Sequence, residues 1–112
     1  MAGRLLLAGF VLAAGVACER PPKTPPEAYS RFCAKCHGAD GRGDAKTIGP
    51  DPHLDLQVSE MLRRHDVAEV AQRITEGKGR MPGFSTKLTP EEIAALAAFT
   101  IERYGPPVPE RR

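Results

Sequence analysis

Two cysteines and a histidine lie within five residues of this chain, in the stretch "CAKCH" from Cys33 to His37. Thiolates are nucleophiles and metal ligands, and a neutral imidazole is a common metal ligand. Together with Tyr29 and Phe32, the two cysteines stand at positions i, i+3, i+4 and i+7, which share one face of a helix. Two thiols one helical turn apart can both reach the edge of a single planar group.

The spacing Cys-x-x-Cys-His is typical of covalent attachment of a c-type haem. Cys33 and Cys36 would form thioethers with the two vinyl groups of the haem, and His37 would place its imidazole under the iron. Aromatic residues make up only 5% of the 112 residues and tryptophan is absent. A small domain with so few large side chains usually needs a bound group to complete its core. A haem is a large apolar disc that could complete this core.

Three other kinds of site could use the two cysteines. A zinc site needs four ligands, usually as two pairs; His53 and His65 could complete one, but their spacing follows no zinc-site pattern. A thioredoxin-like redox pair requires a βαβ setting, and the sequence has no run of alternating apolar residues that indicates a sheet. A disulfide between Cys33 and Cys36 leaves the thin core unexplained. We therefore favour haem over all three.

Three helices are expected to hold the site. Their starts have the chemistry of helix caps, at Thr24–Glu27, Asp66–Glu69 and Thr89–Glu92. Gly77 is expected to end the second helix and Gly105 the third. The long segment "GADGRGDAKTIGPDPHLDLQVSE", rich in glycine and proline, follows the first helix and needs something to wrap around. The sequence thus predicts an all-α domain.

The N-terminus has the pattern of an export signal. Leu5 to Ala17 is an apolar run of 13 residues, shorter than the roughly 20 that a membrane-spanning helix needs. Cys18 follows at once, and "GVAC" resembles the lipobox of bacterial lipoproteins, with Gly15 where that motif usually has leucine. Cleavage after Ala17 and an uncleaved anchor are the alternatives to lipidation. The proline-rich stretch "ERPPKTPPEAY" then predicts a stiff spacer.

From Thr24 to Tyr104 the chain resembles a class I bacterial c-type cytochrome. Four stretches carry the resemblance: "YSRFCAKCHG", "IGPDPHL", "GRMPGF" and "EEIAALAAFTIERY". It implies the cytochrome c fold, with three main helices and long loops around one covalent haem. The last stretch looks like the C-terminal helix that crosses the first helix in this family. Leu96 and Phe99 on it are expected to face Tyr29.

The resemblance also implies a set of cofactor-binding residues. Met81, in a loop punctuated by glycine and proline, looks like the axial methionine, and its thioether is a soft iron ligand. The carbonyl of Pro50 is expected to accept a hydrogen bond from the imidazole and fix its ring. The metal ligands are then His37 and Met81. The full predicted set is Cys33, Cys36, His37, Met81 and Pro50.

Some residues compete for these roles. Met61, His53 and His65 are the other candidates for the far side of the iron, although "SEMLRR" indicates a helical turn in which Met61 and Leu62 pack. Three basic residues are either partners of the haem propionates or ordinary solvated charges: Arg42, Lys78 and Arg80.

The predicted organisation is a signal peptide (1–17), a lipid-attachment cysteine with a proline-rich linker (18–26), a cytochrome c domain (27–105) and a C-terminal tail (106–112). The expected function is one-electron transfer with membrane-bound or periplasmic redox proteins, on the periplasmic side of a bacterial membrane, without enzymatic turnover. A haem subunit of a larger oxidoreductase and a haem-based sensor are the alternatives. A net charge of +2 provides no strong basic field for nucleic acid. A lipid on Cys18 would attach the protein to the membrane.

Overall fold

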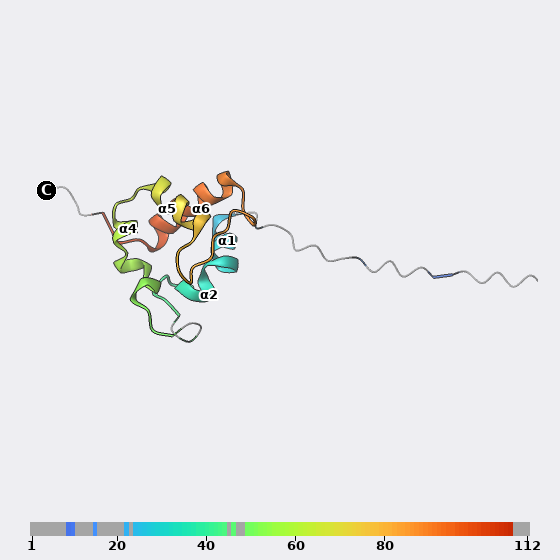
Figure 1. The fold of residues 1–112 in the computed structure, drawn as a ribbon, viewed down its shortest axis with the longest axis horizontal. Coiled ribbons are helices and arrows are strands. Elements are labelled where there is room, and N and C mark those ends of the chain that lie inside the picture. Colours follow the sequence, from blue (N-terminus) through green and yellow to red (C-terminus); the bar gives the residue numbers. More distant parts are fainter. Residues whose placement is uncertain are drawn as a thin grey trace, which may run out of the picture.

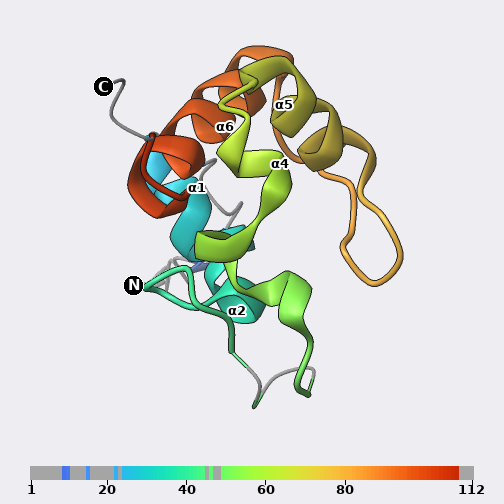
Figure 2. The ribbon, with the colours of Figure 1, turned by 90° about the vertical axis from the view of Figure 1, so that its left-hand side faces the viewer.

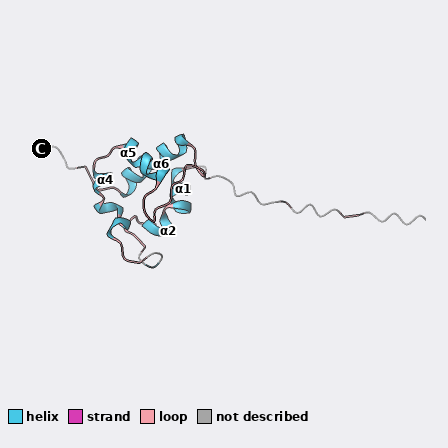
Figure 3. Cartoon of the chain, viewed as in Figure 1, coloured by secondary structure: helices cyan, strands magenta, loops and turns pink. Residues whose placement is uncertain are grey.

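The computed structural model describes residues 9, 10, 15, 22, 24–44, 46 and 49–108. Helices dominate these ranges (Figures 1 and 3), and the described part contains no strand beyond an isolated bridge between Lys78 and Met81. The prediction of an all-α fold is confirmed. The elements are α1 (Pro25–Phe32), α2 (Ala34–His37), the 3-10 helices η1 (Pro52–Leu54) and η2 (Leu56–Val58), α4 (Glu60–Arg63), α5 (Val67–Glu76) and α6 (Pro90–Tyr104).

The predicted helix starts are confirmed by their caps. Thr24, Asp66 and Thr89 are the N-cap residues of α1, α5 and α6. Each side-chain oxygen accepts a hydrogen bond from the backbone N–H three residues later, at 3.4, 3.1 and 3.1 Å. At α6 the Glu92 carboxylate also accepts from the Thr89 N–H at 3.0 Å, which completes a capping box. Local chemistry therefore fixes where these helices begin.

The first predicted helix is broken at Cys33 into α1 and α2. Cys33 has φ −111° and ψ −41°, so it leaves the regular helix for one residue. Its N–H still donates to the Tyr29 carbonyl at 2.8 Å, and its carbonyl accepts from the His37 N–H at 2.9 Å. These bonds keep the chain close to a helical path. The break corrects the expectation of one continuous helix, while Cys33 and Cys36 stay one turn apart.

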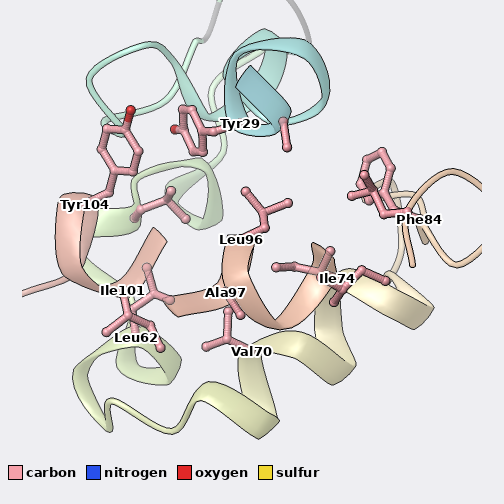
Figure 4. Packing of buried hydrophobic residues seen from close by; sticks show 13 residues of the cluster. Tyr29, Leu62, Val70, Ile74, Phe84, Leu96, Ala97, Ile101 and Tyr104 are labelled. Carbon is pink, nitrogen blue, oxygen red and sulfur yellow. The ribbon is translucent and has the colours of Figure 1, made fainter. Parts of the chain in front are cut away.

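Aromatic rings join the two terminal helices. Tyr29 on α1, 2% exposed, stacks on Tyr104 of α6 with ring centroids 4.2 Å apart, and meets Phe99 edge-on at 6.2 Å. Leu96 of α6 is completely buried beside them (Figure 4). The expected crossing of the helices at Leu96 and Phe99 is thus present. Tyr104 also takes part in this crossing, and its ring lies closer to Tyr29 than that of Phe99 does.

Helix α5 covers another face of α6. Val70 and Ile74 are the buried residues of α5, and they pack with Ala97 and Ile101 of α6 in the same core cluster (Figure 4). This face of α5 is therefore buried against α6. No helix in the described ranges is both long enough and apolar enough to cross a membrane.

The long segment after α2 has more local structure than expected. Asp51 and Asp55 accept hydrogen bonds from the N–H groups of His53 and Gln57, both at 2.9 Å, and so cap η1 and η2. Helix α4 follows, with Leu62 buried. Because aspartate readily caps a turn two residues ahead, this segment makes short turns that bring its backbone to the rest of the domain.

Replacing Leu96 with alanine should destabilise the domain by about 2–5 kcal/mol, because a completely buried leucine leaves a cavity when it is truncated. Urea unfolding of the haem-loaded protein, followed by circular dichroism, measures the loss. Val58→Ala is the control, since Val58 is 59% exposed, and we expect it to change stability by less than about 0.5 kcal/mol. Equal losses in the two variants would contradict this description of the core.

Candidate haem site

The two thiols of the motif lie at the junction of α1 and α2. Both are free and partly buried, and Cys33 packs against the core cluster. Burial, with a smaller contribution from Cys36, raises the pKa of the Cys33 thiol to about 12. Before haem attachment, the raised pKa favours the protonated form of this thiol.

The imidazole of His37 is held by a backbone carbonyl. His37 Nδ1 lies 2.9 Å from the carbonyl oxygen of Leu54, 17 residues further along the chain. A carbonyl can only accept, so Nδ1 carries the proton and Nε2 keeps its lone pair. An imidazole held in this way is oriented as a metal ligand, because the outer hydrogen bond fixes both its tautomer and its ring.

The carbonyl that holds His37 belongs to Leu54, whereas the resemblance to class I cytochromes implies that of Pro50. The turn η1 explains the difference, because it folds back after the Asp51 cap and presents the carbonyl of its last residue. Pro50 instead lines a neighbouring cavity of about 370 Å³, together with Arg42, Gly43, Asp51, Pro52, Leu54 and Asp55. Asp51 followed by Pro52 is a turn signal in the sequence, but that signal does not tell which carbonyl of the turn will face His37.

Backbone hydrogen bonds hold the segment after His37 against the turns. The Gly43 N–H donates to the His37 carbonyl at 2.7 Å, and the Leu56 N–H donates to the Gly41 carbonyl at 2.7 Å. Gly43 has φ +97°, and a Cβ there would lie 2.9 Å from Cβ of Leu54. This glycine therefore allows the close approach that brings Leu54 to the histidine.

Two tyrosines from the helix crossing hold the same segment. Tyr29 Oη donates to the Gly38 carbonyl at 2.7 Å, and Tyr104 Oη donates to the Ala39 carbonyl at 3.1 Å. Burial raises the pKa of Tyr29, so it remains a donor at physiological pH. The crossing of the terminal helices thus positions the two residues that follow His37. Sequence reasoning missed Tyr104, although its place in the last turn of a predicted helix was a signal.

Met81 stands at the end of a tight hairpin between α5 and α6. The Lys78 N–H donates to the Met81 carbonyl at 2.9 Å, and the Met81 N–H donates to the Lys78 carbonyl at 3.0 Å. Gly77 (φ +70°) and Gly79 (φ +57°) supply the left-handed conformations that the hairpin needs. The Met81 side chain is partly buried and packs on the core cluster. Figure 2 shows this segment projecting beyond the helices.

The chain after Met81 is fixed to the end of α5. The Phe84 N–H donates to the Ile74 carbonyl at 2.9 Å, and the Phe84 side chain is buried. A Cβ on Gly83 would lie 2.5 Å from the Thr75 carbonyl oxygen, so only glycine fits there. The methionine loop is therefore anchored on its C-terminal side.

The competing ligands have other environments in the structure. His53 is exposed, with Nδ1 3.0 Å from Asp51 Oδ1, and His65 Nε2 lies 3.3 Å from the Pro106 carbonyl oxygen. Met61 lies on α4 and packs on the core, as the sequence predicted. Within the described ranges, no three histidine, cysteine, aspartate or glutamate side chains are grouped as a metal site. The zinc alternative therefore has no support in this part of the chain.

The residues present fit a covalent haem. A pair of thiols one turn apart, an imidazole with its outer nitrogen engaged and a loop thioether form a suitable donor set. Seven side chains from separate parts of the fold pack on the core but remain partly exposed, and a bound apolar group would cover them: Phe32, Cys33, Ala34, Met61, Ala71, Met81 and Phe99.

Comparison with known proteins identifies the family. The model of "Cytochrome C oxidase, cbb3-type, subunit III" matches residues 20–99. Cytochrome c6 of Gloeothece citriformis is 34% identical over 77 residues, which cover 67% of this chain and 64% of that protein. The FixP subunit of the cbb3-type cytochrome c oxidase of Azorhizobium caulinodans is 33% identical over 78 residues, covering 69% of this chain and 25% of FixP.

Solved structures agree with the sequence comparison. The KustC0563 c-type cytochrome superposes with a TM-score of 0.59 at 26% identity, over 73% of this chain and 98% of that chain. The chain spans slightly less than two thirds of the Gloeothece cytochrome c6. On these grounds the chain belongs to the cytochrome c family, as a class I monohaem cytochrome of the kind described as cbb3-type subunit III and cytochrome c6, and it carries one covalently bound haem c.

Proposed function

We propose that this protein is a one-electron carrier whose haem is bound through Cys33 and Cys36 and ligated by His37 and Met81. The observation that carries the proposal is the hydrogen bond of His37 Nδ1 to Leu54, which leaves Nε2 as the donor for iron. Each thiol would add across one vinyl group of the haem, its sulfur bonding to one carbon and its hydrogen going to the other, so attachment would need no oxidant. The bound haem supplies the Fe(II)/Fe(III) couple.

The protein's own residues control the environment of that couple. His37 and Met81 together would fill both axial positions, which leaves no open site for a substrate. A methionine–histidine pair raises the reduction potential of a haem. The partly buried apolar side chains around the site would keep water from the haem. These features support an electron carrier rather than an enzyme.

A spectrum of the haem-loaded full chain tests the proposal. We expect the oxidised protein to show the weak red band of methionine–iron ligation, and the reduced protein not to bind carbon monoxide. A protein that lacks the band and binds carbon monoxide rapidly is instead the haem-based sensor.

A role as a haem subunit is the second candidate, because the family model that matches is that of an oxidase subunit and FixP is a subunit of such an oxidase. Copurification from membranes in mild detergent distinguishes the two. A carrier should be recovered alone, whereas a subunit should bring stoichiometric partner chains with it.

Cys18, most of the signal sequence and part of the proline-rich stretch lie outside the described residues, so membrane attachment is part of the proposal. Of the 16 lysines and arginines, one, Arg4, precedes Cys18, against 14 acidic residues in all. The processed chain is thus nearly neutral and attracts partners only weakly over long distances. A lipid anchor would raise the local concentration of the domain near membrane-bound redox partners.

Replacing Cys18 with serine should release the haem-loaded protein from the membrane, or block its processing, without changing its spectrum. Fractionation of cells into membrane and periplasm, with haem staining, makes the measurement. Electron transfer to membrane partners should fall and should depend only weakly on salt. Recovery of the unmodified protein entirely in the soluble periplasmic fraction would show that the anchor is wrong and would leave the haem site intact.

A further inference from the structure

The carboxylate of Asp51 lies between the two loops that carry the proposed axial ligands. Its Oδ1 accepts hydrogen bonds from the N–H and from Nδ1 of His53, at 2.9 and 3.0 Å. Its Oδ2 lies 3.7 Å from Nη2 of Arg80. One side chain therefore contacts both the segment that holds His37 and the hairpin that ends at Met81.

On the histidine side, Asp51 acts through the turn η1. It is the N-cap residue of η1, and the last residue of that turn is Leu54, whose carbonyl holds His37 at 2.9 Å. The position of the Asp51 backbone is thus coupled to the hydrogen bond that orients the imidazole. This part of its role needs a side-chain oxygen but no charge.

On the methionine side, Asp51 acts through Arg80. Arg80 immediately precedes Met81, inside the hairpin that two backbone hydrogen bonds close between Lys78 and Met81. Because the hairpin is closed in this way, a restraint on the Arg80 guanidinium also restrains Met81. This part of the role does need the negative charge.

Asp51 carries that charge at neutral pH. Its pKa is lowered, chiefly by the backbone hydrogen bond from His53, then by the His53 side chain and by Arg80. The carboxylate is protonated only as the pH falls through this lowered pKa, so the ion pair with Arg80 is present above it.

We propose that Asp51 is a positioning residue that joins the two ligand loops through Arg80 and thereby disfavours the displacement of Met81 from the iron. The proposal rests on the ligation proposed above. Because the Arg80 and Asp51 side chains are 63% and 29% exposed, water and salt weaken their attraction. We expect the ion pair to change the equilibrium for displacement of Met81 by about two- to fivefold.

Displacement of Met81 by imidazole in the oxidised, haem-loaded full chain tests the proposal, with loss of the red methionine band as the signal. The variants are Asp51→Asn, Arg80→Gln and the double variant. Asparagine keeps the oxygen that caps η1 and removes only the charge. Each single variant should bind imidazole about two- to fivefold more tightly, and the double variant no more tightly than either one. High salt should shrink the difference from the unmodified protein.

Two controls separate the ion pair from general effects. Asp55→Asn alters a cap of the same kind, on η2, where Asp55 accepts from the Gln57 N–H at 2.9 Å. Glu69→Gln breaks another exposed ion pair, in which Arg64 Nε donates to Glu69 at 2.9 Å. Neither should change the affinity for imidazole.

The double-mutant cycle decides the outcome. Unchanged imidazole binding in Asp51→Asn, or effects of the two single variants that simply add, would overturn the role of Asp51 while the methionine band shows that the ligand set stands. Absence of the band from the unmodified protein would overturn both the proposed ligation and the role of Asp51 that rests on it.

Discussion

Replacing Cys33 and Cys36 together with alanine should abolish covalent haem attachment, so that any remaining haem leaves with the solvent in acid–acetone extraction. The reason is chemical: without the two sulfurs no thioether can form. Both thiols lie at the α1–α2 junction, one turn apart and partly buried, where they can reach the edge of one planar group. Haem staining of the denatured chain after electrophoresis should fall below detection.

The same double variant should also lose stability. A bound group that favours the folded state contributes its binding free energy to folding. Without the haem, partly buried side chains such as Phe32 and Phe99 are more exposed to water. We expect a lower melting temperature and broader unfolding than in the unmodified protein.

Two variants control for this experiment. Lys35→Ala changes one of the two residues between the cysteines and leaves both sulfurs in place. Cys18→Ser removes the third cysteine of the chain. Both should keep haem that resists extraction. Haem that stays covalently bound after the loss of Cys33 and Cys36 would contradict the proposed attachment.

Replacing Met81 with alanine should open the sixth position of the iron. The red methionine band should disappear and the reduced protein should bind carbon monoxide. The reduction potential should fall by on the order of 0.1 V or more, since axial ligands tune haem potentials over a range of about 0.8 V. Spectroelectrochemical titration measures the potential, and carbon monoxide difference spectra measure access to the iron.

Met61→Ala is the matched control, because Met61 is also a partly buried methionine that packs on the core but lies on helix α4. It should leave the band, the potential and the resistance to carbon monoxide unchanged. An unaltered spectrum in the Met81 variant, with a change in the Met61 variant, would move the ligand to α4.

Local signals in the sequence predicted most of the helical framework. The caps at Thr24, Asp66 and Thr89 hydrogen-bond to groups three residues away, so they are visible in any short window of the chain. The spacing of Cys33, Cys36 and His37 indicated covalent haem for the same reason. Comparison with known cytochromes then confirmed the family, the all-α fold and the haem.

Contacts between distant segments could not be predicted in this way. Cys33 interrupts the continuous helix that the sequence predicts. Its hydrogen bonds to Tyr29 and His37 are kept, so only one residue leaves the helical conformation. The stacking of Tyr104 on Tyr29 depends on where α6 crosses α1. Several aromatic residues on one helix could meet the other, and only the packing of the whole core selects among them.

The sequence by itself determined the helix starts, the haem-attachment motif and the candidate methionine, because each depends on residues a few positions apart. Only the tertiary structure decided that Leu54, rather than Pro50, holds His37, and that Asp51 meets Arg80 across two loops. The physical reason is that a loop can close with many backbone partners at similar entropic cost. The capped turns, the close-packed glycines and the contacts of the loops with the buried core select one partner among them.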